Sequence, residues 1–146
     1  MGKMTIEDFA DRVSEAMAVI SKEFLRHHVE NFHKIKITLP QIIVLETLYR
    51  QGEINMTDLA RALNVTTAAV TGLCDRLVRD GYAERIDDPA DRRVVKIKLT
   101  GEGKRVAKHV LDQRKKTMIR IFGMVSQDER EKYLSILEHI REHLNK

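Results

Sequence analysis

Apolar residues recur at helical spacing along the start of the chain, with polar residues between them. A period of about 3.6 residues is typical of an amphipathic helix that buries one stripe. We therefore expect a long first helix from Ile6 to about Lys34. Its apolar stripe consists of Ile6, Phe9, Val13, Met17, Ile20 and Phe24.

A second helix is predicted directly after the first. Thr38 followed by Pro40 marks its start, because proline in the first turn of a helix loses no hydrogen bond. Gly52 marks its end, since glycine is the usual residue where a helix stops. Ile54 then predicts a very short strand.

Two short helices separated by a tight turn follow. The pattern predicts one helix over residues 56–63 and another that is opened by Thr66 and Thr67. Threonine side chains accept hydrogen bonds from free N–H groups at a helix start. Gly81 ends the second of these helices.

A β-hairpin is predicted after this pair of helices. Residues 82–86 and 94–99 have the composition of antiparallel strands. In the second strand apolar residues alternate with Lys96 and Lys98, which is typical of a half-buried strand. The loop between the strands contains three aspartates, a proline and two adjacent arginines.

Two more helices close the chain. Thr100 caps a helix that extends to about Met124, and Ser126 with Glu129 forms the capping box of the last helix. The apolar stripe of that last helix consists of Tyr133, Ile136, Leu137, Ile140 and Leu144.

This order of elements predicts a mainly α fold with a small β-hairpin wing, a winged helix-turn-helix over residues 38–100. Residues 1–37 and 101–146 form a helical region whose stripes find no partner in so small a core. We expect them to pair with a second copy across a twofold axis; the alternative is a monomeric six-helix bundle. The residues expected at the dimer contact are Ile6, Phe9, Val13, Tyr133, Ile136, Leu137, Ile140 and Leu144.

Composition narrows the class of protein. The 146 residues form one domain by length, with a net charge of +4 that suits a nucleic-acid partner but does not establish one. The single cysteine excludes an internal disulfide bond. No apolar run approaches the ~18 residues of a membrane span, and none has the pattern of a signal-peptide h-region. We expect a cytoplasmic protein with no membrane contact.

The helix that begins at Thr67 has an unusual outward face. Its apolar residues fall on one side, and the opposite side has Ala68 and Gly72 where a solvated helix prefers long charged residues. Glycine inside a helix costs about 1 kcal/mol relative to alanine. Close approach of a DNA major groove would offset that cost, with the methyl group of Thr71 free to meet a thymine methyl.

The hairpin predicts the second half of a DNA interface. We expect Asp91 to orient one arginine by a charge-assisted bond while another projects, with Arg93 in the minor groove and Arg92 on a phosphate. Arg76 is a second candidate partner for Asp91. Thr66 and Thr67 place N–H groups at a positive helix end, which suits a phosphate.

The predicted DNA contacts divide into two sets. Residues expected at base edges are Ala68, Thr71, Gly72, Asp75 and Arg76, with Arg93 in the minor groove. Residues expected at the phosphate backbone are Thr66, Thr67, Arg79, Arg92, Lys96 and Lys98. Two such units in a dimer predict a double-stranded DNA site with twofold symmetry.

The chain resembles the multiple-antibiotic-resistance regulator (MarR) family of winged-helix repressors. The resemblance extends over essentially the whole chain, and its most specific element is Asp91-x-Arg93 followed by a strand and Leu99-Thr100. It is also carried by Leu59-Ala60, Thr67-Ala68-Ala69-Val70-Thr71, Arg76-Leu77, Gly81-Tyr82, Asp88-Pro89-Ala90 and Gly101-Glu102-Gly103. The resemblance implies a homodimer on a pseudo-palindromic operator and release of repression by a small aromatic or anionic molecule.

An effector of that kind would lie between the first, second and fifth helices and change the spacing of the two wings. The candidate walls of its pocket are Phe24, His28, Phe32 and Tyr49.

Other functions have weaker support in the sequence. Cys74 suggests a redox-responsive regulator, but its helical phase places it inward, where a thiol is inert. His139 and His143 have ligand-compatible spacing, and zinc-responsive members of the family use histidines of the first and fifth helices, which points to His33 and His109. We expect no metal and no cofactor.

The sequence has no nucleophile with a nearby base and no glycine-rich phosphate loop, so we expect no enzyme. A winged helix used only for protein docking would explain the fold, but not the bare helix face or the arginines of the hairpin loop. The prediction is a homodimeric, sequence-specific DNA-binding transcriptional regulator that acts as a repressor.

Overall fold

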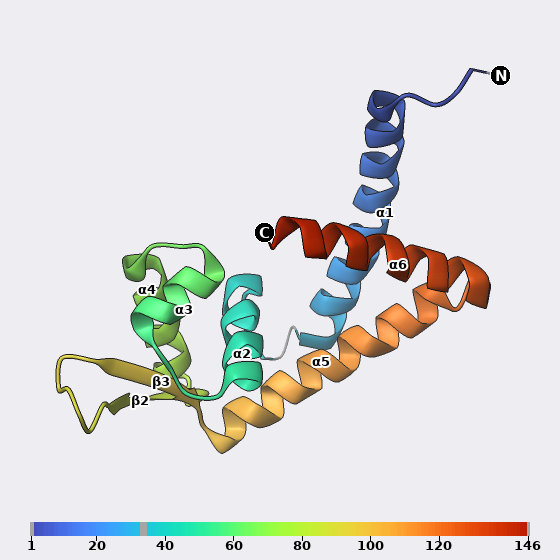
Figure 1. Ribbon diagram of the computed structural model, residues 1–146. Coiled ribbons are helices and arrows are strands. Elements are labelled where there is room, and N and C mark those ends of the chain that lie inside the picture. The colour runs from blue at the N-terminus through green and yellow to red at the C-terminus, as the bar shows by residue number, and fades with distance from the viewer. Residues whose placement is uncertain (1, 33–34, 146) are drawn as a thin grey trace. The chain divides into compact units, whose positions relative to one another are not determined.

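The computed structural model describes residues 2–32 and 35–145. It is mainly helical with a three-stranded antiparallel sheet (Figure 1), which confirms the predicted fold class. In chain order the elements are α1 (Ile6–Phe32), α2 (Leu39–Gln51), β1 (Ile54–Asn55), α3 (Met56–Leu63), α4 (Thr67–Arg79), β2 (Ala83–Asp87), β3 (Val95–Leu99), α5 (Gly101–Phe122) and α6 (Gln127–Leu144).

Side-chain caps fix the helix starts where the sequence predicts them. The Thr38 hydroxyl accepts from the Gln41 N–H at 3.4 Å, and Gln41 Oε1 accepts from the Thr38 N–H at 2.8 Å. The same reciprocal pair forms between Ser126 and Glu129 at the start of α6. These bonds satisfy N–H groups that have no partner inside the helix. Gly81 follows α4 with φ at 82°, in the left-handed region that favours glycine.

The sheet has the order β1-β3-β2, with Lys96 opposite both Asn55 and Ile86. Both strands of the hairpin begin one residue later than predicted. Tyr82 donates its N–H to Leu77 O at 2.9 Å and so belongs to the turn that follows α4. Val94 donates to Asp91 O at 3.0 Å and so belongs to the hairpin loop. Local hydrogen bonds at the two turns therefore keep Tyr82 and Val94 out of the strands.

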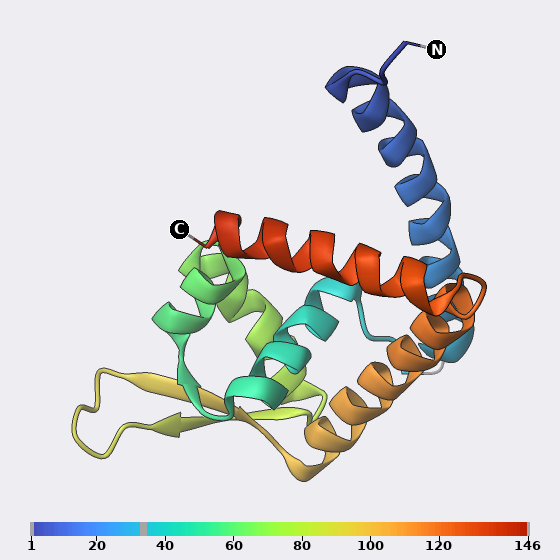
Figure 2. The same cartoon turned by 45° about the vertical axis from the view of Figure 1, so that its right-hand side comes forward.

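The core lies among α2, α3, α4, the sheet and the first half of α5. Leu45, Leu59, Leu77 and Ile97 are fully buried there, from α2, α3, α4 and β3 respectively, and α5 contributes Val106, Ala107 and Val110. Alternation along β3 buries Ile97 and Leu99, as predicted. The loop between β2 and β3 extends away from these helices in both views (Figures 1 and 2).

The chain forms two compact units, Met1–Gln113 and Arg114–Lys146, and α5 contributes residues to both. In the second unit the rings of Phe122 and Tyr133 stack with their centroids 5.4 Å apart. Arg130 donates to the carbonyls of Phe122 and Val125 and so holds the turn before α6. The predicted division into residues 38–100 and two flanking segments stays a prediction.

The apolar stripes of α1 and α6 are largely exposed to solvent. None of the α6 residues is buried. The exposed fractions are 72% for Ile6, 51% for Phe9, 46% for Tyr133, 58% for Ile136, 44% for Leu137, 48% for Ile140 and 80% for Leu144, and Val13 is half-buried. Within the described residues, no helix has the length and apolar character needed to cross a membrane.

The start of α5 lies against the turn that follows α4. Thr100 donates its N–H to Tyr82 O at 3.1 Å and its hydroxyl to Gly81 O at 2.6 Å. The Thr100 hydroxyl also accepts from the Gly103 N–H at 3.0 Å. A Cβ atom at Gly103 would lie 1.8 Å from Tyr82 O, so only glycine allows this backbone contact.

Gly103→Ala should therefore destabilise the protein, because the added carbon meets backbone and not a flexible side chain. Overpacking of this kind costs about 1–3 kcal/mol or more. Gly101→Ala is the matched control in the same turn of α5, since its Cβ would meet nothing within 4 Å. Urea unfolding followed by circular dichroism measures both variants, and equal stabilities would contradict the close contact.

Candidate nucleic-acid interface

One side of α4 is packed into the core and the other faces solvent, as the sequence predicts. Val70, Cys74 and Leu77 have no exposed surface. Leu73 and Val78 are half-buried and pack against the same core. The exposed residues of the opposite side are Ala68, Gly72, Asp75, Arg76 and Arg79.

The first half of this exposed face has only small side chains, at Ala68 and Gly72. A Cβ atom at Gly72 would meet nothing within 4 Å, so packing inside this chain does not require glycine there. Thr71 is half-buried and donates its hydroxyl to Thr67 O at 2.8 Å. The Thr71 hydroxyl is thus used within the helix.

The turn between α3 and α4 places the start of α4 at the surface. Asn64 ends α3 in the left-handed conformation with φ at 52°, and Thr66 caps α4 by accepting from the Ala69 N–H at 3.1 Å. Thr66 and Thr67 are both exposed. The positive end of the α4 dipole therefore faces solvent beside two hydroxyl groups.

Asp75 is paired with a residue that sequence reasoning missed. Asp75 is predicted to lie at a base edge, and in the structure its carboxylate bonds to Arg85 of β2. This pair joins α4 to the hairpin and neutralises the negative charge of Asp75 on the exposed face. The stabilisation is modest, because pairs near the surface contribute about 0–1 kcal/mol. No local sequence signal identifies Arg85, since the two residues meet only once β2 packs on α4.

The hairpin loop presents an oriented arginine. Asp91 accepts from Arg93 at three positions: the backbone N–H at 3.0 Å, Nε at 3.1 Å and Nη2 at 3.2 Å. The Arg93 side chain is nevertheless 90% exposed. The Arg93 side-chain bond is the main reason why the pKa of Asp91 lies below its ordinary value. The guanidinium is therefore held in place and still points outward.

The predicted bond between Asp91 and an arginine is confirmed, and its partner is Arg93. The expected places of Arg93 in the minor groove and of Arg92 on a phosphate stay predictions. Arg76 was considered as a second partner of Asp91, yet both Asp91 oxygens accept from Arg93. Arg92 is exposed beside it.

Three cations that were expected to face phosphates have carboxylate partners. Lys98 Nζ lies 3.2 Å from Glu84, and Arg79 Nε lies 3.5 Å from Asp80. Lys96 Nζ lies 3.2 Å from Asp88 and 3.4 Å from Glu53. These acids lie on other strands or loops or just beyond the helix end, so the ion pairs were not predicted, and the expected phosphate contacts stay predictions.

Cys74 is a poor candidate for redox sensing. It has no exposed surface, and burial raises the pKa of its thiol to about 11. The reactive form of cysteine is the thiolate, which is scarce at neutral pH when the pKa is so high. The inward orientation predicted from helical phase is confirmed.

The histidines form no evident ligand set in the described part of the chain. Among the residues whose side chains the structure describes, no three His, Cys, Asp or Glu residues are arranged so that they could hold a metal ion. The rings of His139 and His143 lie 4.4 Å apart, and His143 Nδ1 is 2.8 Å from His139 O. One ring nitrogen is thus already occupied by the helix backbone. His33 lies outside the described residues.

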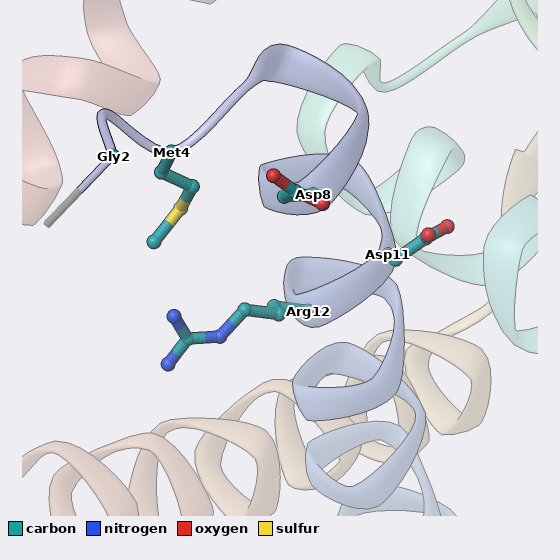
Figure 3. A pocket seen from close by; sticks show the side chains of 5 residues that line it. All are labelled: Gly2, Met4, Asp8, Asp11 and Arg12. Atoms are coloured by element: carbon teal, nitrogen blue, oxygen red, sulfur yellow. The ribbon is translucent and has the colours of Figure 1, made fainter.

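The effector walls predicted from sequence are only partly described. Phe24 is half-buried and Tyr49 is 41% exposed, whereas the side chains of His28 and Phe32 lie outside the described part of the structure. A hollow elsewhere lies beside the first turns of α1 (Figure 3). Its lining is Gly2, Met4, Asp8, Asp11 and Arg12, so it contains none of the predicted walls.

Comparison with known proteins identifies the family. A model of the MarR family matches residues 37–95, which include α2 to α4 and most of the hairpin. An uncharacterized HTH-type transcriptional regulator of Bacillus subtilis, YsmB, is 30% identical over 142 residues, or 95% of this chain and 97% of YsmB. The chain belongs to the MarR family.

Other MarR-family relatives agree with this assignment. The HTH-type transcriptional repressor MdtR of Bacillus subtilis is 32% identical over 69% of this chain and 65% of its own length. The structure of Streptococcus pneumoniae FabT in complex with DNA has a TM-score of 0.83 and 22% identity, over 93% of this chain and 97% of FabT. The latter likeness shows the shared fold. This MarR-family chain is a transcriptional regulator and not an enzyme.

Proposed function

We propose that this MarR-family regulator acts as a homodimer that binds double-stranded DNA in a sequence-specific manner and represses transcription. Two observations carry the proposal: the outward face of α4 has small side chains, and the wing loop presents the exposed Arg93. A helix that enters a major groove needs small residues where its backbone approaches the bases. An exposed arginine on the wing is suited to the narrow, negative minor groove.

The contacts follow from this placement. Ala68, Gly72 and the Thr71 methyl group meet base edges in the major groove, and Arg76 adds donors at the far end of the same face. Arg92 and the N–H groups at the start of α4 bind phosphates. Asp75 contributes through its pair with Arg85, which fixes α4 against the hairpin.

A dimer is the second part of the proposal. The exposed apolar stripes of α1 and α6 support it, because monomeric proteins rarely leave large contiguous apolar surfaces in water. A twofold axis would place the two α4 helices in successive major grooves, about 34 Å apart. The operator is then a pseudo-palindrome.

Repression and its release are the third part. MdtR is named as a repressor, and it matches over two thirds of this chain. We propose that a small aromatic or anionic molecule bound near Phe24 and Tyr49 changes the spacing of the two wings. Such a ligand would prefer a dimer conformation whose wing spacing does not fit the operator. A preference of about 100-fold weakens DNA binding by roughly 2.7 kcal/mol.

Selection of duplexes from a random pool tests the function directly. With excess polyanion competitor, a sequence-specific regulator retains a preferred site. A winged helix that serves only for protein docking retains none. The exposed apolar stripes of α1 and α6 are the observation that favours this alternative. A pool without enrichment would contradict the proposal.

Substitution of Gly72 tests whether the bare face meets DNA. Gly72→Ala should raise the stability of the protein by up to about 1 kcal/mol, because alanine favours the helix and no neighbour obstructs it. Gly72→Glu should also fold and dimerise, yet lose at least 100-fold in affinity for the selected duplex. Thermal unfolding and fluorescence anisotropy measure the two effects. Retained affinity in Gly72→Glu would show that this face points away from DNA.

Substitution of Leu137 tests the dimer. Leu137→Asp places a charge in the apolar stripe of α6 and should shift the protein to monomers while weakening binding to the full site. Ser135→Asp introduces the same charge at an exposed position on the opposite side of α6 and should leave the dimer intact. Analytical ultracentrifugation measures both variants. A monomeric Leu137→Asp that still binds the full site tightly would contradict the symmetric arrangement.

A further inference from the structure

We propose that Lys96 is a positioning residue for the wing, which holds the loop that presents Arg93 by joining Asp88 to Glu53, and that it is not a phosphate contact. The inference rests on the proposed function, because it concerns how Arg93 reaches DNA. It also reverses the role that the sequence suggested for Lys96.

Lys96 lies at the centre of the sheet. It is on β3, the middle strand, directly opposite Asn55 of β1 and Ile86 of β2. Its ammonium group lies 3.4 Å from Glu53, just before β1, and 3.2 Å from Asp88, just after β2. One side chain thus connects the segments that flank β3 on both sides.

Asp88 is the point where this connection reaches the wing loop. Its N–H donates to Val94 O at 3.1 Å and closes the base of the loop. Its Oδ1 accepts from the Ala90 N–H at 2.8 Å, and its Oδ2 faces Lys96. Both carboxylate oxygens are therefore occupied, one by the loop and one by the strand.

A continuous series of bonds leads from Lys96 to the exposed arginine. Asp88 bonds to Val94, and Val94 donates its N–H to Asp91 O at 3.0 Å. The Asp91 carboxylate then binds the backbone N–H and the guanidinium of Arg93. The Arg93 side chain is 90% exposed, so this series of bonds is what defines its direction.

Charge and exposure favour a positioning role for Lys96 over contact with a phosphate. Lys96 is 29% exposed and faces two carboxylates, so the three groups together carry one net negative charge. A phosphate would have to compete with both acids for a half-buried ammonium group. Bonding to Asp88 raises the pKa of Lys96, and bonds from Ala90 and then Lys96 lower the pKa of Asp88. The pair therefore stays ionised across the neutral range.

The effect should appear in loop order and not in global stability. Ion pairs that are partly exposed contribute only about 0–1 kcal/mol to folding. The loop itself has little else to hold it, because it extends away from the helices (Figure 2). Its local order therefore depends on the bonds at Asp88 and Asp91.

The test compares Lys96→Met, which keeps the aliphatic stem and removes the charge, with the wild-type full chain. In the absence of DNA, backbone ¹⁵N order parameters of Ala90, Asp91 and Val94 should fall from about 0.85 to below about 0.6, with an unchanged melting temperature. Lys98→Met is the matched control for loop order, because Lys98 is on the same strand but pairs with Glu84 of β2. It should leave these order parameters unchanged. Asp88→Asn combined with Lys96→Met should add nothing further.

A second measurement uses the duplex that the wild type selects from a random pool. Lys96→Met should bind it about tenfold more weakly with the same salt dependence. Loss of a phosphate contact would instead lower the slope of log K against log salt by about 0.9. Unchanged loop order, or a lowered slope, would overturn the positioning role. Failure of the wild type to select any duplex would contradict the proposed function, and the order parameters measured without DNA distinguish that outcome.

Discussion

The burial of one side of α4 is the constraint on which the rest of this structure depends. Val70, Cys74 and Leu77 have no exposed surface and pack among α2, α3 and the sheet. Removal of their apolar surface from water fixes the rotation of the helix about its axis. That rotation leaves Ala68 and Gly72 outward, with Asp75 positioned to meet Arg85. The end of α4 also sets the Gly81 turn, on which the start of α5 packs.

Charge compensation distinguishes this DNA-binding proposal from one based on a basic surface. The net charge is only +4, and Arg85, Lys96 and Lys98 of the sheet each have a carboxylate partner. Such pairs orient side chains more than they attract a polyanion. Arg93 combines both properties, because Asp91 directs it while most of its surface stays in water. We therefore expect salt dependence to reflect a few well-placed arginines and not the total number of lysines and arginines.

Sequence patterns predicted the elements well because their causes are local. Helix starts follow from side chains that cap within three residues, as at Thr38 and Ser126, and the helix end at Gly81 follows from backbone conformation. Interactions between distant segments were not predictable in this way. Arg85 meets Asp75 only after β2 packs on α4, and Lys96 meets Glu53 only after β1 joins the sheet. A single sequence contains no periodicity that identifies such partners, so the ion pairs of Asp75 and Lys96 were not predicted.

The central claim is that two copies of the α4 face and its wing meet one duplex in a symmetric arrangement. Footprinting on the selected duplex tests it most directly, with dimethyl sulfate for the major groove and hydroxyl radicals for the minor groove. The account predicts two protected major-groove segments whose centres are about 10 base pairs apart, each with a protected minor groove beside it. A single protected segment, or protection of the minor groove alone, would contradict it.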